Sequence, residues 1–264
     1  MEINLLQKNF GRMGARVLVG TVENRFRQRE GINIRNDEHG EFFDILLPQG
    51  ATVSYEVVDI DVRLRHLLLL SRNGGVKTKF LCGHDERHWF VCAVPDTSAT
   101  NVRKAMESLQ PAEVRVAVNR KVKRAKNRLS RRNEAFVRQG EWFFIPAPNL
   151  VVKETEVHKN EPISRGGGSK PHMCQQLYRS GGEVVWVSSK RPNGVTKSQY
   201  EQLLKSNRKA KNWDWRMMRR NAAVYVRGRV WHKDHKTIVL KTWHRVLMNT
   251  ENQAPGRGSV VFLD

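Results

Sequence analysis

The chain has 264 residues, with 47 Lys or Arg against 26 Asp or Glu, so its formal net charge is +21 at pH 7. Hydrophobic residues make up 39% of it, which excludes an intrinsically disordered protein, because such chains lack the apolar side chains to build a core. Repulsion among so many cations destabilises a compact fold unless a partner neutralises them. Nucleic acid is the commonest such partner, so the composition favours a nucleic-acid-binding protein.

The sequence shows no signal peptide and no membrane-spanning segment. Its opening residues, MEINLLQKNF, lack a continuous apolar core, and no apolar stretch approaches the roughly 18 residues that cross a bilayer. The three cysteines, at positions 82, 92 and 174, have no zinc-finger spacing and are expected to be reduced. We therefore expect a cytoplasmic protein that makes no membrane contact.

The first hundred residues predict an antiparallel β-sheet. Residues 58–65, VDIDVRLR, alternate apolar and charged side chains, which is typical of a half-buried strand. The apolar runs FFDILL before it and HLLLL after it are expected to extend the sheet. Residues 76–81 and 89–94 are two further apolar runs, and the polar gap between them predicts a hairpin.

Helical periodicity replaces this alternation after Thr97. An i, i+3, i+4, i+7 stripe of apolar residues predicts an amphipathic helix that ends near Pro111: Val102, Ala105, Met106 and Leu109. A second apolar stripe at helical spacing predicts another helix, which continues to residue 132: Val118, Val122, Ala125 and Leu129.

Residues 153–172 lose apolar content and include SRGGGSKPH, so we expect a domain boundary near residue 150. Residues 1–150 would form a β-sheet lobe followed by a basic helical segment, and residues 151–264 a linker and a smaller basic α+β lobe. In that lobe Ser198 and Glu201 fit a capping box, and residues 222–231 and 236–247 predict paired strands. The expected fold class is α+β: mainly antiparallel sheet, two central helices and a second β-rich lobe.

Charge is unevenly distributed along the chain. Residues 30–61 contain eight acidic side chains and one basic one, whereas residues 120–132 contain eight basic side chains and no acidic one. From residue 187 to residue 245 there are sixteen basic and three acidic side chains. The acidic region is expected to face a protein partner or to balance the basic surface.

The basic segment 120–132 is the strongest functional signal in the sequence. It offers no carboxylate for i,i+4 pairs, so an isolated helix of this composition would repel itself. Phosphates laid along it would release their condensed counterions, which favours binding. The predicted phosphate contacts are Arg120, Lys121, Lys123, Arg124, Lys126, Arg128, Arg131 and Arg132.

A second basic stretch, residues 208–220, also contains aromatic side chains. Flat rings stack on unpaired bases while cations hold the backbone, which favours RNA slightly over DNA; the alternative is that both tryptophans are core residues. The predicted contacts are Arg208, Lys209, Lys211, Trp213, Trp215, Arg216, Arg219 and Arg220. No helix-turn-helix, RNP, KH or zinc-knuckle motif is present. We therefore expect recognition of backbone and shape, as in a ribonucleoprotein subunit or, alternatively, a packing or assembly protein.

Two predicted hairpin tips carry paired histidines with acidic neighbours. The pairs are His84 with His88 and His232 with His235. Should the two tips meet, the four imidazoles would bind a divalent metal ion, and a metal-dependent nuclease is the alternative function. Histidine and aspartate are also ordinary turn residues. No catalytic residue is assigned, and no other cofactor is expected.

Overall fold

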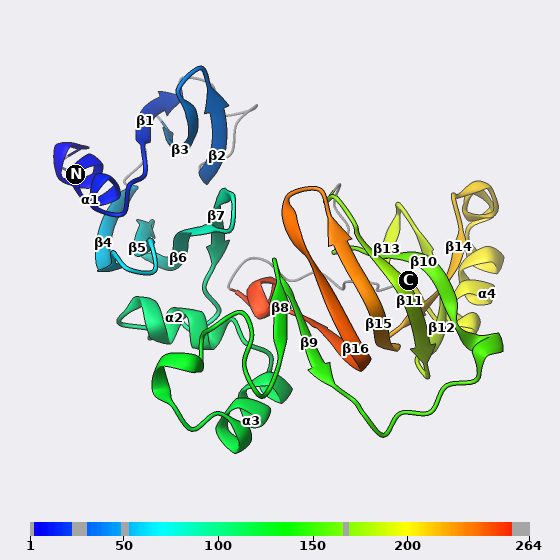
Figure 1. The fold of residues 1–264 in the computed structure, drawn as a ribbon. Coiled ribbons are helices and arrows are strands. Elements are labelled where there is room, and N and C mark those ends of the chain that lie inside the picture. Colours follow the sequence, from blue (N-terminus) through cyan, green and yellow to red (C-terminus); the bar gives the residue numbers. More distant parts are fainter. Residues whose placement is uncertain (1–2, 23–30, 49–52, 166–168, 255–264) are drawn as a thin grey trace. The chain divides into compact units, whose positions relative to one another are not determined.

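The structure is a computed structural model that describes residues 3–22, 31–48, 53–165 and 169–254 (Figure 1). In these ranges the fold is mixed α+β and dominated by sheet, as predicted, with four α-helices and sixteen strands. The chain divides into two compact units, unit 1 (residues 1–116 and 249–258) and unit 2 (residues 117–248 and 259–264). None of the described helices is long and apolar enough to cross a membrane.

Unit 1 is built on two sheets and a short N-terminal helix, α1 (Ile3–Arg12). The first sheet has the order β1-β3-β2, in which β1 and β3 are parallel and β2 and β3 antiparallel. The second is an antiparallel meander in the order β4-β5-β6-β7. The strands are β1 (Val17–Val22), β2 (Gly31–Asp37), β3 (Gly40–Pro48), β4 (Ser54–Asp61), β5 (His66–Asn73), β6 (Val76–Asp85) and β7 (His88–Ala93).

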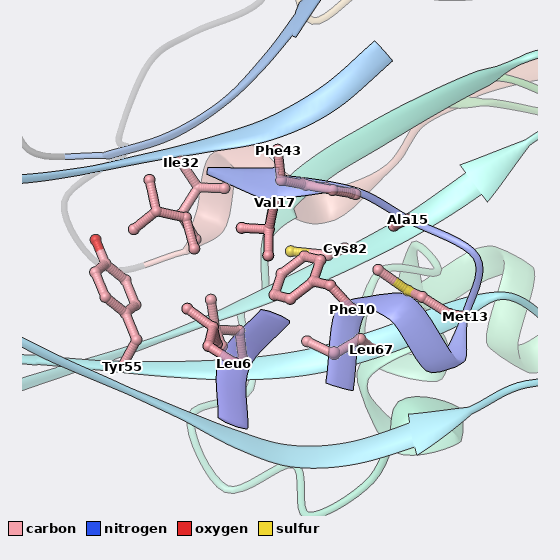
Figure 2. Close-up of a cluster of buried hydrophobic side chains, with 12 residues drawn as sticks. Leu6, Phe10, Met13, Ala15, Val17, Ile32, Phe43, Tyr55, Leu67 and Cys82 are labelled. Atoms are coloured by element: carbon pink, nitrogen blue, oxygen red, sulfur yellow. The ribbon is translucent and has the colours of Figure 1, made fainter. Parts of the chain in front are cut away.

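The run of leucines in β5 is explained by packing on both faces of the meander. Leu67 and Leu69 belong to a core shared with α1 and the first sheet, where Phe10 and Phe43 are fully buried (Figure 2). Leu68 points to the other face and joins a core that includes residues of α2 (Val102–Ser108). A strand that is covered on both sides reads as a continuous apolar run instead of an alternating one.

The predicted helix with Val102 and Leu109 is confirmed as α2. The Asn101 side chain caps it by accepting the amide hydrogen of Lys104, and Asp59 Oδ2 accepts that of Val102 at 2.8 Å. The 3-10 segment η4 (Thr250–Gln253) completes unit 1.

The predicted strand over residues 58–65 is too long. β4 ends at Asp61, whose Oδ1 accepts the amide hydrogen of Leu64 at 3.0 Å. The chain turns there, with Arg65 in the left-handed region at φ 56°. Aspartate stabilises such turns through a local hydrogen bond, which overrides the alternating pattern.

Unit 2 contains a six-stranded antiparallel sheet and a smaller three-stranded one. The large sheet has the order β10-β11-β15-β16-β9-β8 and the small sheet the order β13-β12-β14. The strands of the large sheet are β8 (Val137–Gln139), β9 (Trp142–Pro146), β10 (His158–Ile163), β11 (His172–Ser180), β15 (Ala223–His232) and β16 (His235–Met248). Those of the small sheet are β12 (Glu183–Ser188), β13 (Arg191–Val195) and β14 (Arg216–Arg220).

Helix α4 (Lys197–Ser206) lies in the chain between β13 and β14 of the small sheet, and it begins earlier than predicted. Its capping box is formed by Thr196 and Gln199, not by Ser198 and Glu201. Three 3-10 segments complete the unit: η1 (Ala125–Asn127), η2 (Glu154–Glu156) and η3 (Arg208–Asn212).

The division between the units does not fall at residue 150, where the sequence placed it. It lies within α3 (Ala112–Lys121). Strands β8 and β9 precede residue 150 but pair into the same sheet as β16, so they belong to unit 2. The stretch read as a linker contains β10, which pairs with β11 despite its polar composition.

The predicted basic helix over residues 120–132 is wrong. Helix α3 ends at Lys121, after burying Val114 and Val118, and Val122 is the last buried apolar residue of the stripe. Beyond it the chain forms only η1 and turns. Like charges three and four residues apart destabilise a helix, and this segment has no carboxylate to offset them.

Candidate metal-binding site and basic surface

Three histidines from three adjacent strands of unit 2 lie together. His172 begins β11, His232 ends β15 and His235 begins β16. In the β11–β15 register Met173 faces Trp231, which places His172 beside His232, and His232 pairs directly with His235 across the hairpin. The cross-strand pairing therefore brings the three imidazoles together at one end of these strands.

The three rings are close enough to share one ligand. Their centroids lie 4.2 Å apart for His172 and His232, 5.3 Å for His172 and His235, and 4.8 Å for His232 and His235. One ring nitrogen from each residue falls within 4.8 Å of the other two. A tetrahedral zinc ion with bonds of about 2.1 Å holds its ligand nitrogens about 3.4 Å apart, so binding one ion would require the stacked rings to turn toward it.

His172 is buried and neutral. Its residue is only 1% exposed, and neither ring nitrogen has a hydrogen-bond partner among the described residues. Burial, and after it the neighbouring His232 and His235, lower the pKa of His172 to about 3. A neutral imidazole with a free lone pair is the form that binds a metal ion.

The turn between β8 and β9 lies against the same histidines. Gly140, at φ 56°, comes so near that a Cβ there would stand 2.8 Å from His235 Nε2 and 3.3 Å from His172 Nε2. Gln139 donates from Nε2 to the carbonyl oxygens of Val230 at 3.3 Å and Lys236 at 2.7 Å. A side chain at position 140 would therefore force His235 and His172 to shift, and Gln139 ties this turn to the strands that carry the histidines.

His232 already uses one ring nitrogen. Its Nδ1 accepts the amide hydrogen of Asp234 at 3.1 Å, so the neutral ring carries its proton on Nε2. A metal ion bound through Nε2 would shift that proton to Nδ1 and break this hydrogen bond. Such a bond contributes about 1 kcal/mol net, whereas structural zinc binding supplies about 10–16 kcal/mol. The hydrogen bond is therefore no obstacle to metal binding.

The predicted metal ligands are divided between the two units. His232 and His235 lie in the cluster, and the sequence reasoning missed His172, because only the pairing of β11 with β15 brings it to the hairpin. His84 and His88 lie in unit 1, where His88 Nδ1 is 2.7 Å from Glu41 Oε1 and the His84 ring contacts Trp89. Burial and, secondly, the charge of Arg65 lower the pKa of His84. A joint site of the two tips, and the nuclease that depends on it, stay predictions.

The basic segment 120–132 comprises the last two residues of α3 and the loop that follows it; most of its side chains are exposed up to Lys126, and those from Asn127 to Arg131 are half-buried. Asn133 fixes it by donating to Asn127 O at 3.0 Å and accepting the amide hydrogens of Ala135 and Phe136. Arg128 donates to Asn119 Oδ1; Arg128 and Arg131 are half-buried, and Arg132 is exposed. In the part of the chain that the structure describes, no carboxylate ion-pairs with five exposed cations of this segment: Arg120, Lys121, Lys123, Arg124 and Lys126.

The second predicted stretch contributes to a row of half-buried aromatic rings in unit 2. Trp186 stacks on Tyr200 with centroids 5.3 Å apart, Tyr200 meets the edge of Trp215 at 5.0 Å, and Trp215 stacks on Trp213 at 5.6 Å. Trp215 also donates its indole hydrogen to Ala210 O at 2.7 Å. Trp215 lies within the row and is anchored, as a packing residue would be. Trp213 is the end member of the row, which is where a base could stack.

The predicted cations of this stretch differ in their surroundings. Four of them are exposed around the aromatic row: Arg208, Lys209, Lys211 and Arg216. Arg220 instead forms an ion pair with Glu183 at 2.6 Å, and Arg219 donates to Gly181 O at 3.1 Å. In the described structure the four exposed cations are therefore the ones available to a ligand.

The acidic region 30–61 is engaged within unit 1. Asp37 pairs with Arg16 at 2.7 Å and Asp44 with Arg35 at 2.6 Å. Glu41 accepts the amide hydrogen of Trp89 through Oε2, and its Oε1 lies 2.7 Å from His88 Nδ1. These carboxylates offset charges and satisfy amides inside their own unit.

Comparison of the chain with protein-family models, with curated proteins and with solved structures finds no match. Two features of unit 2 bear on its function, the histidine cluster and the exposed cations.

Proposed function

We propose that the protein binds nucleic acid through unit 2, by contacts to the phosphate backbone. The observation that carries the proposal is the group of exposed cations at the end of α3 and in the following loop, namely Arg120, Lys121, Lys123, Arg124 and Lys126, whose charges no carboxylate of the described chain neutralises. Cations of a structural network are normally paired, because an unpaired cluster repels itself. Phosphates would remove that repulsion and release counterions.

A loop suits this role as well as a helix. Asn133 ties Asn127 to the chain that follows by a side-chain hydrogen bond, so the backbone that carries the cations is anchored although no α-helix continues through it. Contacts of this kind position a ligand without reading its sequence. We therefore propose recognition of backbone and shape.

Single-stranded RNA is the proposed ligand class, with duplex DNA bound more weakly. The support is Trp213, a half-buried ring at the end of an aromatic row and next to the exposed Arg208, Lys209 and Lys211. A base stacked on Trp213 would extend the row, while neighbouring cations hold its phosphates. Every base has an aromatic face, so this grip would be tolerant of sequence.

The test is charge reversal in the loop. Replacing Lys123, Arg124 and Lys126 by Glu removes three exposed cations that make no ion pair in the described structure, so the fold should be retained. We expect affinity for a single-stranded RNA to fall more than about tenfold at 0.1 M salt, and the slope of log K against log salt to shrink by about 2. Fluorescence anisotropy measures both quantities.

A matched variant separates a local contact from the overall charge. Lys77, Arg87 and Lys104 are also exposed, but they lie in unit 1. Reversing these three changes the net charge equally and should leave the salt slope nearly intact. Equal losses in the two variants, or salt-independent binding by the unmodified chain, would contradict the proposal.

A further inference from the structure

We infer that His172, His232 and His235 form a binding site for a single divalent transition-metal ion of the zinc type. The three residues come from adjacent strands, and one ring nitrogen of each lies within 4.8 Å of the others. This site is separate from the loop proposed to bind nucleic acid, so its test does not depend on that function.

Of the three metal-ligating side chains, His172 is held rigidly by its surroundings, whereas His232 and His235 have room to turn. His172 is 1% exposed and packs against the fully buried Trp142. His232 and His235 are half-buried and flank the two-residue turn of the β15–β16 hairpin. Their rings can turn toward a metal ion, while His172 stays fixed in the sheet.

Buried polar atoms without hydrogen-bond partners lie at the histidine cluster. Both ring nitrogens of His172 and the Oε1 of Gln139 are buried without a hydrogen-bond partner in the described chain. Buried polar atoms in proteins are nearly always satisfied, by protein groups, water or an ion. A metal ion bound to His172 would satisfy one of these nitrogens with a bond.

The ligand set selects the metal. Three neutral imidazoles suit Zn²⁺, Co²⁺, Ni²⁺ or Cu²⁺, whereas Mg²⁺ and Ca²⁺ require oxygen ligands. Three protein ligands leave one position of a tetrahedral ion for water or another molecule.

The experiment loads the full chain with zinc alone. After chelation and buffer exchange, the protein is titrated with ZnCl2 in a calorimeter, and Co²⁺ is added separately to record its visible absorption. We expect one ion per chain, a tetrahedral cobalt spectrum, no response to Mg²⁺, and a melting temperature that rises with zinc, because the ion binds only the folded chain.

Two variants and one control locate the ion. His232→Asn and His235→Asn change half-buried residues at the adjoining ends of β15 and β16, so both should fold, as checked by thermal unfolding without metal. Each should weaken zinc binding more than about a hundredfold, since loss of an outer-sphere partner alone costs 10–100-fold. His158→Asn removes an exposed histidine of β10 and should leave binding unchanged.

Several results would overturn the inference. They are the absence of stoichiometric zinc in the unmodified chain, undiminished binding by both turn variants, or an equal loss in His158→Asn. RNA binding is measured on the same samples without metal. Loss of zinc with RNA binding retained, or the reverse, therefore distinguishes failure of one proposal from failure of the other.

Discussion

The rings of His172 and His232 lie face to face, with centroids 4.2 Å apart and planes 19° from parallel. This stack exists because β11 and β15 are neighbours in the large sheet of unit 2 and their register places the two residues beside each other. His235 joins them through the tight hairpin that follows. Two long-range strand pairings thus create a group of imidazoles that is scattered in the sequence.

Trp213 should be the aromatic residue that contacts RNA. Replacing it by Ala removes the end of the row and should weaken single-stranded RNA binding by about 1–3 kcal/mol, the usual contribution of one stacked base. Quenching of tryptophan fluorescence on RNA addition should shrink in the same variant. Filter binding and fluorescence titration measure the two effects.

The exposed Met217 provides the control for Trp213. It lies on β14, which begins three residues after Trp213, and the residue is 71% exposed. Met217→Ala should leave RNA affinity within about twofold. If Trp213→Ala binds as tightly as this control, Trp213 is a packing residue only.

Residues near in sequence account for what could be predicted of the fold. The α2 stripe, the β6–β7 hairpin and the β15–β16 hairpin all follow from local periodicity, and the structure contains each of them. Local periodicity could not show that β8 and β9, before residue 150, share a sheet with β16, because that pairing joins residues far apart in the sequence. For the same reason His172 was missed, since it ends the stretch that was read as a linker.

The basic segment shows a different limit. Apolar residues at helical spacing continue beyond Lys121, but the helix does not, because eight cations without a carboxylate oppose it. Periodicity describes which residues can be buried, whereas charge decides here whether the helix forms. The same charges that end α3 leave the cations exposed in a loop.

The ion pair of Asp37 with Arg16 should make unit 1 sensitive to acid. The hydrogen bond from Arg16 lowers the pKa of Asp37 from its ordinary 3.8 to about 2. The folded state therefore binds fewer protons than the unfolded state between these values, and the pair's stabilisation is present above pH 4 and lost as the pH falls toward 2. Asp37→Asn keeps an acceptor for the amide of His39 but cannot form the ion pair.

Thermal unfolding of the unmodified chain and of Asp37→Asn measures this effect. The difference in melting temperature should be largest above pH 4 and should vanish near pH 2. The side chains of Arg16 and Asp37 are 40% and 34% exposed, so added salt should screen the ion pair and reduce the difference in melting temperature. A difference that is constant from pH 5 to pH 2 would show that the carboxylate's charge contributes nothing.

Gly140 should be required for the histidine cluster to bind metal. Alanine there would bring its Cβ to 2.8 Å from His235 Nε2 and 3.3 Å from His172 Nε2, so the imidazoles would have to move apart. Gly181 is the matched control, because its φ of 67° is also left-handed but a Cβ there meets nothing within 4 Å.

Both alanine variants should lose about 1–2 kcal/mol of unfolding free energy in urea because of backbone strain, and Gly140→Ala should lose about 1–3 kcal/mol more because of overpacking. Only Gly140→Ala should lose zinc affinity, by at least about tenfold in calorimetry. Equal zinc affinities in the two variants would mean that the β8–β9 turn does not shape the site.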